Sequence, residues 1–401
     1  MNQKPAMLTL AIASLCAFPA FSGEAVPGQV FSWSADARLR HEQVDDVGFA
    51  RRADATTLRL RAGVGIRASE TLSGYVEAEG TAALDDDYNS TANGRTGFPV
   101  VADPRAVELN QAWLRWKTDT TGVTAGRQRL LLANQRWVGN VGWRQNEQTF
   151  DAVAVNWQPG TATAVTYAWL DRVHRVNTDQ ALAPLARERA LDTHLLDGEF
   201  KTGSQRIGGY LYLHDDQDQP AASTRTMGAR WTLDRTRDGK GWGLALEAAH
   251  QSDHAGNPLR FDHAYWRVEP SLALRGVTYR AGWEHLGGDG RHALQTPLAT
   301  LHAFNGWSDM FLVVPAGGLD DRYLKAGGTL GPVAGDRQVS WSVAYHDFRA
   351  DTGGRYGQEL NASLAVPLSP TTQALVKVAD YRSDGFSRDT RKLWLQLEWK
   401  R

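Results

Sequence analysis

Apolar and polar residues alternate in short runs along most of this chain, from about residue 31 to residue 399. Side chains point alternately to the two faces of a β-strand, so each such run gathers its apolar residues on one face. A strand that borders lipid on one side and a watery lumen on the other requires this pattern, and no helix has its period. The clearest runs are Val339, Trp341, Val343 and Tyr345, and Leu393, Leu395, Leu397 and Trp399. The pattern predicts an all-β fold, a transmembrane antiparallel up-and-down β-barrel.

The connections between these runs are short and long in turn. We expect about eighteen strands, the first centred near Asp36 and the last near Leu395. Short connections, rich in the residues of tight turns, fall at 69–71, 118–121, 158–160, 201–204, 331–336 and 368–371. Long connections fall at 86–106, 132–148, 173–188 and 287–319. Outer-membrane barrels have short periplasmic turns, long extracellular loops and an even number of strands, so this alternation favours their class.

Tryptophans support the same interpretation. Several fall near predicted strand ends or at outward positions: Trp33, Trp116, Trp157, Trp231, Trp242, Trp283, Trp341 and Trp399. An amphipathic ring at such a position can sit at the level of the lipid headgroups. A soluble β-sandwich is the alternative, but it needs fewer strands and rarely runs this long as one unit.

The first 22 residues have the features of a Sec signal peptide. Lys4 supplies a positive charge, residues 7–18 form an apolar stretch too short to span a bilayer, and residues 20–22 form a small-x-small cleavage site. We expect cleavage after Ser22, which would leave residues 23–401 as the mature barrel in the bacterial outer membrane. The single cysteine, Cys16, lies in this peptide after Leu15, where a lipoprotein signal has a small residue. We therefore expect neither lipidation nor a disulfide.

Composition narrows the possible partners. The mean hydropathy is −0.43, and no apolar run after the signal approaches the roughly 20 residues of a membrane helix. Alternating strands average out to polar while still presenting an apolar face, so this value agrees with a barrel. The formal net charge of −1 gives no support for a nucleic-acid partner. Outer-membrane lipid is the partner that we expect for the outer face.

The positions between the outward residues would line the lumen, and many are charged. In the expected register the basic ones are Arg38, Arg40, Arg59, Arg61, Arg67, Arg115, Lys117, Arg127 and Arg129, followed by Arg230, Arg267, Arg280, Lys325 and Lys377. The acidic ones are Asp36, Glu42, Glu77, Glu79, Glu199, Glu247, Glu269, Glu284 and Glu359. The turn at 69–71 would place Arg61 opposite Glu79 as a cross-strand ion pair.

This set of charges allows two interpretations. Acids and bases could neutralise one another as a ladder along the lumen wall. Alternatively, an uncompensated excess of arginine in the first third of the chain, at Arg59, Arg61, Arg127 and Arg129, could make the passage favour anions.

Three stretches resemble the alginate-export (AlgE-like) outer-membrane porins. They are GRQRLLLANQRWVGNVGWRQNEQTFDAV at 126–153, RLRHEQV at 38–44 and HAFNGWSDMF at 302–311. The resemblance implies an eighteen-stranded barrel with an arginine-lined pore for an anionic polysaccharide. By the same analogy Arg127, Arg129, Arg136 and Arg144 are candidates for the pore wall or an inward-folded loop. Trp399 is the last aromatic residue of the final alternating run and is followed by Lys400 and Arg401. We expect Trp399 to engage the barrel-assembly machinery.

These observations lead to an expected function. The protein would be an outer-membrane channel for passive diffusion of anionic solutes, among them an anionic polysaccharide or oligosaccharide such as alginate. A general, weakly selective porin is the alternative.

Catalysis and metal binding receive little support from the sequence. His214, Asp215 and Asp216 cluster at one predicted strand end, and His250, Ser252, Asp253 and His254 at another. However, neither a G-x-S-x-G nor an H-E-x-x-H motif is present, so an outer-membrane lipase or protease is the weaker hypothesis. Acidic runs at 85–87 and 320–321 could bind calcium, although such runs also decorate loops. We expect a channel that is not an enzyme and uses no cofactor, and we leave a metal open.

Overall fold

The computed structural model describes residues 30–334 and 337–401, so the predicted signal peptide lies outside the described residues. Eighteen β-strands make up most of the described chain. They are β1 (Phe31–Asp46), β2 (Ala53–Arg67), β3 (Leu72–Asp87), β4 (Ala106–Lys117), β5 (Thr121–Gln128), β6 (Thr149–Trp157), β7 (Thr163–His174), β8 (Glu188–Thr202), β9 (Gln205–His214), β10 (Thr224–Asp234), β11 (Gly241–Asp253), β12 (Asp262–Leu274), β13 (Val277–Leu286), β14 (Leu319–Ala334), β15 (Arg337–Arg349), β16 (Arg355–Pro367), β17 (Thr372–Ser383) and β18 (Thr390–Lys400).

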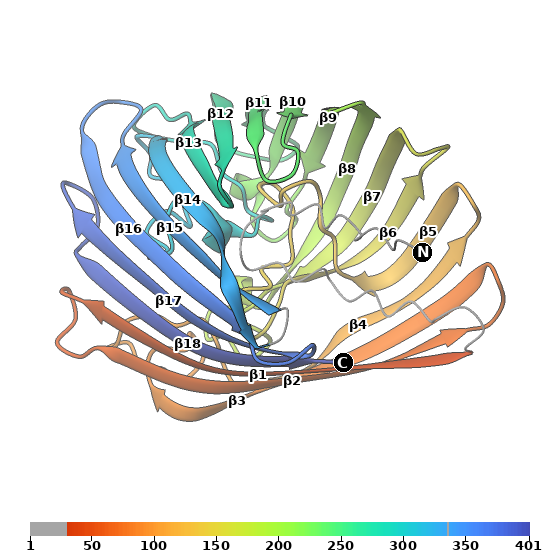
Figure 1. Cartoon of the computed structure of the whole chain (residues 1–401), viewed down its shortest axis with the longest axis horizontal. Helices are drawn as coiled ribbons and strands as arrows, with labels where there is room; N and C mark the ends of the chain where they lie inside the picture. Colours follow the sequence, from red (N-terminus) through yellow and green to blue (C-terminus); the bar gives the residue numbers. More distant parts are fainter. Residues whose placement is uncertain (1–29, 335–336) are drawn as a thin grey trace.

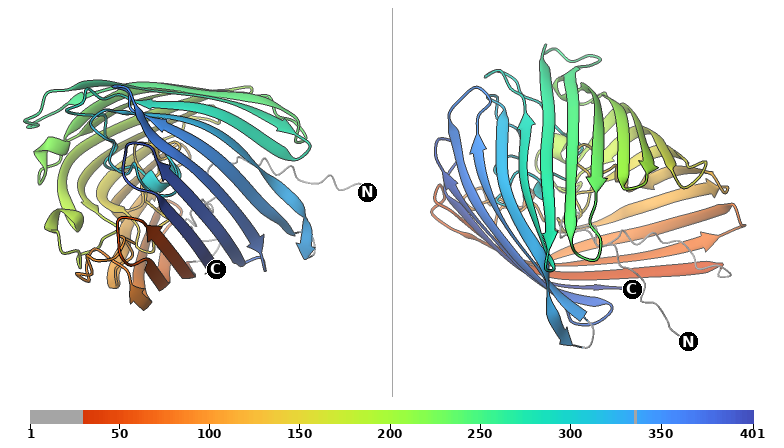
Figure 2. Two further views of the ribbon diagram at one scale, coloured as in Figure 1. Left: turned by 90° about the vertical axis from the view of Figure 1, so that its left-hand side faces the viewer. Right: turned by 45° about the horizontal axis from the view of Figure 1, so that its top comes forward.

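The strands form one closed barrel. Each strand pairs antiparallel with the next in sequence, and β18 pairs with β1. This last pairing keeps one register from Asp36 opposite Lys400 to Asp46 opposite Thr390. The strands tilt steeply around a common lumen, as closure of a sheet into a barrel requires (Figure 1, Figure 2). The predicted fold class and strand number are confirmed.

Short and long connections alternate as the sequence predicts. The short ones include 68–71, 118–120, 203–204, 275–276 and 368–371, and the long ones include 88–105, 129–148, 175–187 and 287–318. A serine closes two of the turns: Ser69 Oγ accepts hydrogen bonds from the backbone N–H of Thr71 and Leu72, and Ser369 Oγ accepts one from Thr371. The helices among the described residues are short 3₁₀ turns, and none is long and apolar enough to cross a membrane.

The alternating pattern separates the two faces of the wall. On β18, Leu395 and Leu397 are 45% and 43% exposed on the outer face, whereas Trp394 and Glu398 point inward and are buried. The eight tryptophans named from the sequence lie on the outer face. Several of them, including Trp116, Trp157, Trp242 and Trp399, lie near the turn ends of the strands. The outer surface therefore has the apolar band and aromatic rim of a lipid-facing barrel.

Two of the long connections fold into the lumen, where they form the largest buried apolar cluster. Trp137 belongs to the loop 129–148, and Leu298 and Phe311 belong to the loop 287–318. These side chains pack against wall residues such as Tyr265 and Phe348. Figure 1 shows both loops inside the ring of strands. Because loops of this kind normally run over the surface, their burial here points to the lumen as the functional site.

Candidate functional site

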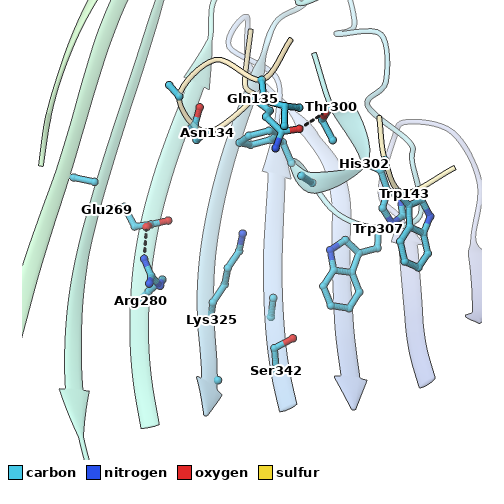
Figure 3. A pocket seen from close by; sticks show the side chains of 18 of the residues that line it. Asn134, Gln135, Trp143, Glu269, Arg280, Thr300, His302, Trp307, Lys325 and Ser342 are labelled. Carbon is cyan, nitrogen blue, oxygen red and sulfur yellow. Dashed lines mark hydrogen bonds and ion pairs between the residues drawn. The ribbon is translucent and has the colours of Figure 1, made fainter. Parts of the chain in front are cut away.

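The two inward loops are joined to each other across the lumen. Gly139 donates its backbone N–H to the Leu298 carbonyl at 2.9 Å, and Thr300 donates its own to the Gln135 carbonyl at 3.1 Å. The Thr300 hydroxyl also donates to the Gln135 side-chain Oε1 at 2.7 Å (Figure 3). Together these bonds make one unit of the loop 129–148 and the loop 287–318.

One side of this unit is fixed by Trp137. Its indole Nε1–H donates to Glu247 Oε1 on β11 at 2.9 Å. Its ring packs edge-to-face against Tyr265 on β12 at 5.1 Å between ring centres, and it lies 5.9 Å from the ring of Tyr210 on β9. Such aromatic contacts add to the hydrophobic stabilisation of the buried side chains. The loop 129–148 is therefore anchored to the wall formed by β9 to β12.

The opposite side contacts β17 and β18. Trp143 stacks on His302 with 4.6 Å between ring centres and a 5° angle between their planes. Asp309 forms ion pairs with Arg144 at 3.0 Å and with Lys392 of β18 at 2.8 Å. Both loops are thus attached to two opposite parts of the barrel wall.

A chamber of about 880 Å³ lies in the lumen next to the joined loops. Its lining extends from Asp234 and Arg401, at the turn ends of their strands, to the two loops. Figure 3 shows Gln135 and Trp307 on the loop side of the chamber. The basic residues predicted for the lumen that line it are Arg38, Arg61, Arg129, Arg230, Arg267, Arg280, Lys325 and Lys377, and the acidic ones are Asp36, Glu77, Glu199, Glu247, Glu269 and Glu284.

Arginines of β1 and β2 form ion pairs with carboxylates of neighbouring strands. Arg38 Nη2 lies 2.8 Å from Glu398 Oε1 on β18. Arg59, which is completely buried, contacts both Asp36 and the same Glu398. Two guanidinium groups therefore share the Glu398 carboxylate at the junction where β18 meets β1.

A second group of pairs lies where β2 and β3 meet the loop 129–148. Arg61 contacts Glu79, as the turn at 69–71 predicts, and also lies 3.5 Å from Glu147 of the loop. Arg129 contacts Glu77 at 2.6 Å and also Glu147. The expected uncompensated charge at Arg59, Arg61 and Arg129 is therefore wrong. Two of the carboxylates that neutralise these arginines are Glu398 of β18 and Glu147 of the loop 129–148. Both lie far from the arginines of β1 and β2 in the sequence, so the pairing of consecutive strands did not predict these contacts.

Three further predicted residues are buried among the loops and the wall. Arg40 lies on β1, while Arg136 and Arg144 belong to the loop 129–148, the inward-folded position that the family resemblance allowed. Each guanidinium has a partner: Gln396 for Arg40 at 2.7 Å, Glu284 for Arg136 at 3.0 Å and Glu42 for Arg144 at 3.1 Å. Arg136 and Arg144 thus attach the loop 129–148 to the wall, and the Arg40 guanidinium meets the same loop 4.1 Å from the centre of the Trp143 ring.

Arg127 lies on the outer face of the barrel, so its predicted inward orientation is wrong. Gln128 occupies the inward position and donates to the Ala152 carbonyl at 2.9 Å, whereas Ala125 and Arg127 point outward. Arg127 pairs outside with Asp151 at 2.9 Å. Side chains alternate along β5, so Arg127 shares the outer face with Ala125. The charge is tolerated there because Arg127 lies at the loop end of β5, next to its ion-pair partner Asp151.

Arg230, Arg267 and Arg115 differ in their relation to the chamber. Arg230 forms a two-point contact with Asp197 at 2.8 and 2.5 Å. Arg267 lies 3.7 Å from the carboxylate of Glu269 and 4.0 Å from that of Glu247. Arg115 is on the inner face near the turn end of β4, beside Gly122, and is not among the chamber-lining residues.

Arg280 and Lys325 are direct neighbours on β13 and β14, and both face the chamber. Arg280 Nη1 contacts Glu269 Oε1 at 3.1 Å (Figure 3). The Lys325 ammonium lies 4.3 Å from the centre of the Tyr323 ring. Among the described residues, no hydrogen bond or ion pair reaches Lys325 Nζ. This part of the wall presents neighbouring cations to the lumen.

The groups considered for catalysis lie apart. His214 bonds to the Thr193 hydroxyl at 2.9 Å on the inner side, whereas His250 contacts Asp262 on the outer face. Ser252 donates to the backbone carbonyl of the next residue. His214 Nε2 also lies 4.0 Å from Asp216 Oδ2, beyond hydrogen-bond distance, so the hydroxyl, imidazole and carboxylate at this strand end adjoin without forming a hydrogen-bonded triad.

The acidic pair at 320–321 also separates, because neighbouring residues of a strand point to opposite faces. Asp321 faces inward, while Asp320 contacts His285 Nδ1 at 3.0 Å on the outside. His285, Asp320 and Asp351 place potential ligand atoms within 4.8 Å of one another at the loop end of the barrel. These are the described residues best able to hold a metal ion.

Sequence reasoning missed the role of the aromatic residues in the long connections. No lumen position was predicted for Trp137, Trp143 or Trp307. They contact Glu247, Trp394 and Lys377 of the wall, respectively, and so attach the loops to it. A signal was present, because a solvent-exposed loop has little reason to carry two tryptophans and the Leu130 to Leu132 run within fourteen residues.

Comparisons with known proteins agree with this architecture. The outer membrane protein OpdK from Pseudomonas aeruginosa has a TM-score of 0.71 and 13% identity to this chain, covering 92% of this chain and 98% of that one. OccK9 (OpdG) from Pseudomonas aeruginosa gives 0.71 and 15%, and OccAB2 from Acinetobacter baumannii gives 0.71 and 12%, each with the same coverage. At these identities the likeness shows the fold.

Sequence comparison identifies the family. We found no match among curated proteins. The family profile described as alginate export matches residues 29–284, which is more than half of the chain and includes the inward loop 129–148. Together with the closed eighteen-stranded barrel, this match shows that the chain belongs to the alginate export family and is an outer-membrane channel.

Proposed function

We propose that this channel passes small anionic solutes by passive diffusion through the chamber. The observation that carries the proposal is the adjacent pair Arg280 and Lys325 on the chamber wall. Their Cα atoms are register partners on β13 and β14, so two cations project into the same part of the lumen. Rings or rows of arginine and lysine in a pore favour anions.

Lys325 contributes most to this attraction. Its ammonium lies 4.3 Å from the centre of the Tyr323 ring, and the residue is half-buried. Glu269 is near enough to interact with it electrostatically, but no ion pair joins the two among the described residues. A charge confined between low-dielectric walls attracts a counter-ion more strongly than the same charge on an open surface. An anionic solute can therefore form the direct ion pair with Lys325 that no described residue forms.

The size of the chamber favours small solutes over a polymer. Its volume of about 880 Å³ lies in the range of roughly 300–1,000 Å³ that encloses a drug-sized molecule. The loops are hydrogen-bonded across the lumen, so a polysaccharide such as alginate would require them to move apart. Among the similar structures, OpdK has been crystallised with vanillate, a small carboxylate, which supports this solute class by analogy.

The reversal potential of the channel under a salt gradient tests the proposal. We expect the parent to prefer anions and the double variant Arg280→Gln, Lys325→Met to lose much of that preference. Arg127→Gln is the matched control, because it removes a positive charge from the outer face and should leave the reversal potential unchanged. A parent without anion preference, or a double variant with the parent's reversal potential at low salt, would support a general, weakly selective porin instead.

Passage of a polymer is tested separately. We expect small uronate sugars added to one side to interrupt the single-channel current, and long alginate chains to produce no translocation. Release of long alginate chains on the far side would contradict the preference for small solutes while leaving the anion preference intact.

A further inference from the structure

Lys377 is the buried side chain at which both inward loops meet the barrel wall. It extends from β17 and is 1% exposed. Its ammonium lies 3.8 Å from the ring centre of Trp307 in the loop 287–318 and 4.0 Å from that of Trp143 in the loop 129–148. We propose that Lys377 is a positioning residue that holds both loops against the wall formed by β17 and β18 and thereby sets the size of solute that can pass.

The attraction between an ammonium and aromatic rings supplies this hold. Trp has the strongest effect of the aromatic side chains, and the attraction grows when water is excluded. A third ring, that of Trp394 on β18, lies 5.3 Å from the Lys377 ammonium. One cation therefore has tryptophans from both loops and from the adjacent strand around it, so moving either loop away would remove one of its contacts.

His302 adds a directional bond to the same loop. Its Nε2 lies 2.6 Å from Lys377 Nζ, and its Nδ1 lies 2.6 Å from Asp309. Burial is the main factor that lowers the pKa of the His302 imidazole well below its usual range; Asp309 opposes this shift and Lys377 adds to it. The neutral ring can therefore donate from Nδ1 to Asp309 and accept from the ammonium at Nε2. His302 also stacks on Trp143, so the histidine connects the two loops at this point.

The loops keep other attachments when Lys377 is changed. Asp309 remains paired with Lys392 on β18 and with Arg144, and Trp137 remains bonded to the opposite wall. Loss of the Lys377 ammonium should therefore loosen the loops without releasing them. Because a buried charge can often be replaced by an apolar group of similar size without loss of stability, Lys377→Met is expected to assemble.

The position of the cluster links it to the width of the passage. Lys377 lines the chamber, and Trp143, His302 and Trp307 line it at the loop side (Figure 3). A displacement of these rings changes the space next to the joined loops directly. The inference concerns the size of the solute, and it holds whether or not the channel prefers anions.

Exclusion of neutral polymers from the open channel tests the inference. The reconstituted parent, Lys377→Met and Lys325→Met would be compared by the effect of polyethylene glycols of increasing size on single-channel conductance. Both variants remove one ammonium from the lumen, but the ring beside Lys325 is that of Tyr323 on β14, whereas those beside Lys377 include rings of both loops. We expect Lys377→Met to admit larger polymers and to show several-fold more frequent conductance transitions, while Lys325→Met keeps the parent's cut-off.

Further variants keep the test decisive. Lys377→Arg retains a cation and is expected to keep the parent's cut-off. His302→Leu removes the acceptor for the ammonium and is expected to behave like Lys377→Met, and it decides the question if Lys377→Met does not assemble. A parental cut-off and parental transition frequency in both variants would overturn the inference. Failure of both to assemble would also overturn it, because the cluster would then serve the barrel and not the loops.

Discussion

Two parts of the barrel wall carry charged side chains into the lumen and use them in different ways. We call β1 to β3 with β18 the paired wall, and β12 to β14 the chamber wall. In the paired wall, Arg59 is completely buried and contacts both Asp36 and Glu398. In the chamber wall, Lys325 faces the lumen beside Arg280. The number of arginines on a strand therefore says less about selectivity than the number of cations left facing water.

The difference has a physical reason. A charge taken out of water loses its hydration, so it is retained only where a counter-charge and hydrogen bonds replace the lost water. The paired wall meets this condition because β18 and the loop 129–148 bring Glu398 and Glu147 to its arginines. The Lys325 side chain remains partly hydrated and does not need a fixed partner. The first arrangement stabilises the barrel, and the second is available to a solute.

The largest effect is expected from breaking the paired wall. Arg59→Met removes a fully buried cation that contacts both Asp36 and Glu398. Arg38 and Lys400 still contact Glu398 in the variant, so the expected cost is that of lost charge-assisted hydrogen bonds, about 1.5–3 kcal/mol of stability. The change should lower the temperature at which the folded form converts to the unfolded form on a heat-modifiability gel. Arg280→Met in the chamber wall is the control. Its pair with Glu269 is 28% exposed on the arginine side, so the expected cost is about 0–1 kcal/mol. Equal shifts in the two variants would contradict the comparison.

The pairing of β18 with β1 completes the paired wall, and a residue at this junction is expected to affect how much barrel is assembled. Trp399 faces outward on β18 opposite Ala37 of β1, and we propose that it directs recognition by the barrel-assembly machinery. Trp399→Ala should reduce the amount of folded protein in the outer membrane more than deletion of residues 400–401. The deletion is a demanding control, because it removes the two backbone hydrogen bonds between Arg401 and Ala35. A larger loss from the deletion would assign the effect to strand closure instead.

At low salt, anion preference should fall more when a charge is removed from the chamber wall than when one is removed from the paired wall. This effect is expected to be smaller than those on stability and assembly. Lys325→Met is expected to lower anion preference more at 0.01 M salt, where the Debye length is about 30 Å, than at 1 M, where it is about 3 Å. Arg61→Gln in the paired wall should change the preference less, because the Arg61 guanidinium is 9% exposed and is already neutralised by Glu79 and Glu147. Reversal potentials at the two salt concentrations measure the anion preference of the parent and of each variant. A greater effect of Arg61→Gln would mean that the paired wall also controls the passage.

The smallest effect is expected from Arg127. Its ion pair with Asp151 lies on the outer face, so Arg127→Gln should change stability by about 0–1 kcal/mol and leave ion selectivity unaltered. Heat-modifiability gels and reversal potentials would be recorded on the same preparation. A clear loss of anion preference would place Arg127 in the lumen and refute its outward register.

The sequence by itself determined the barrel. A period of two over many runs, as at Leu393 to Trp399, assigns one face to lipid, and the alternation of short and long connections gives the strand count. The opposition of Arg61 and Glu79 also followed from the sequence, because a short turn fixes the register of the two strands that it joins. These features depend on residues that are close in the chain.

The tertiary structure alone decided which lumen charges are neutralised and how the passage is narrowed. Glu398 reaches Arg38 only because the last strand closes on the first, and Glu147 reaches Arg61 only because a loop folds inward. Likewise Lys377 meets Trp143 and Trp307 from two separate loops. Contacts between distant segments depend on closure and packing, and no local period in the sequence encodes them.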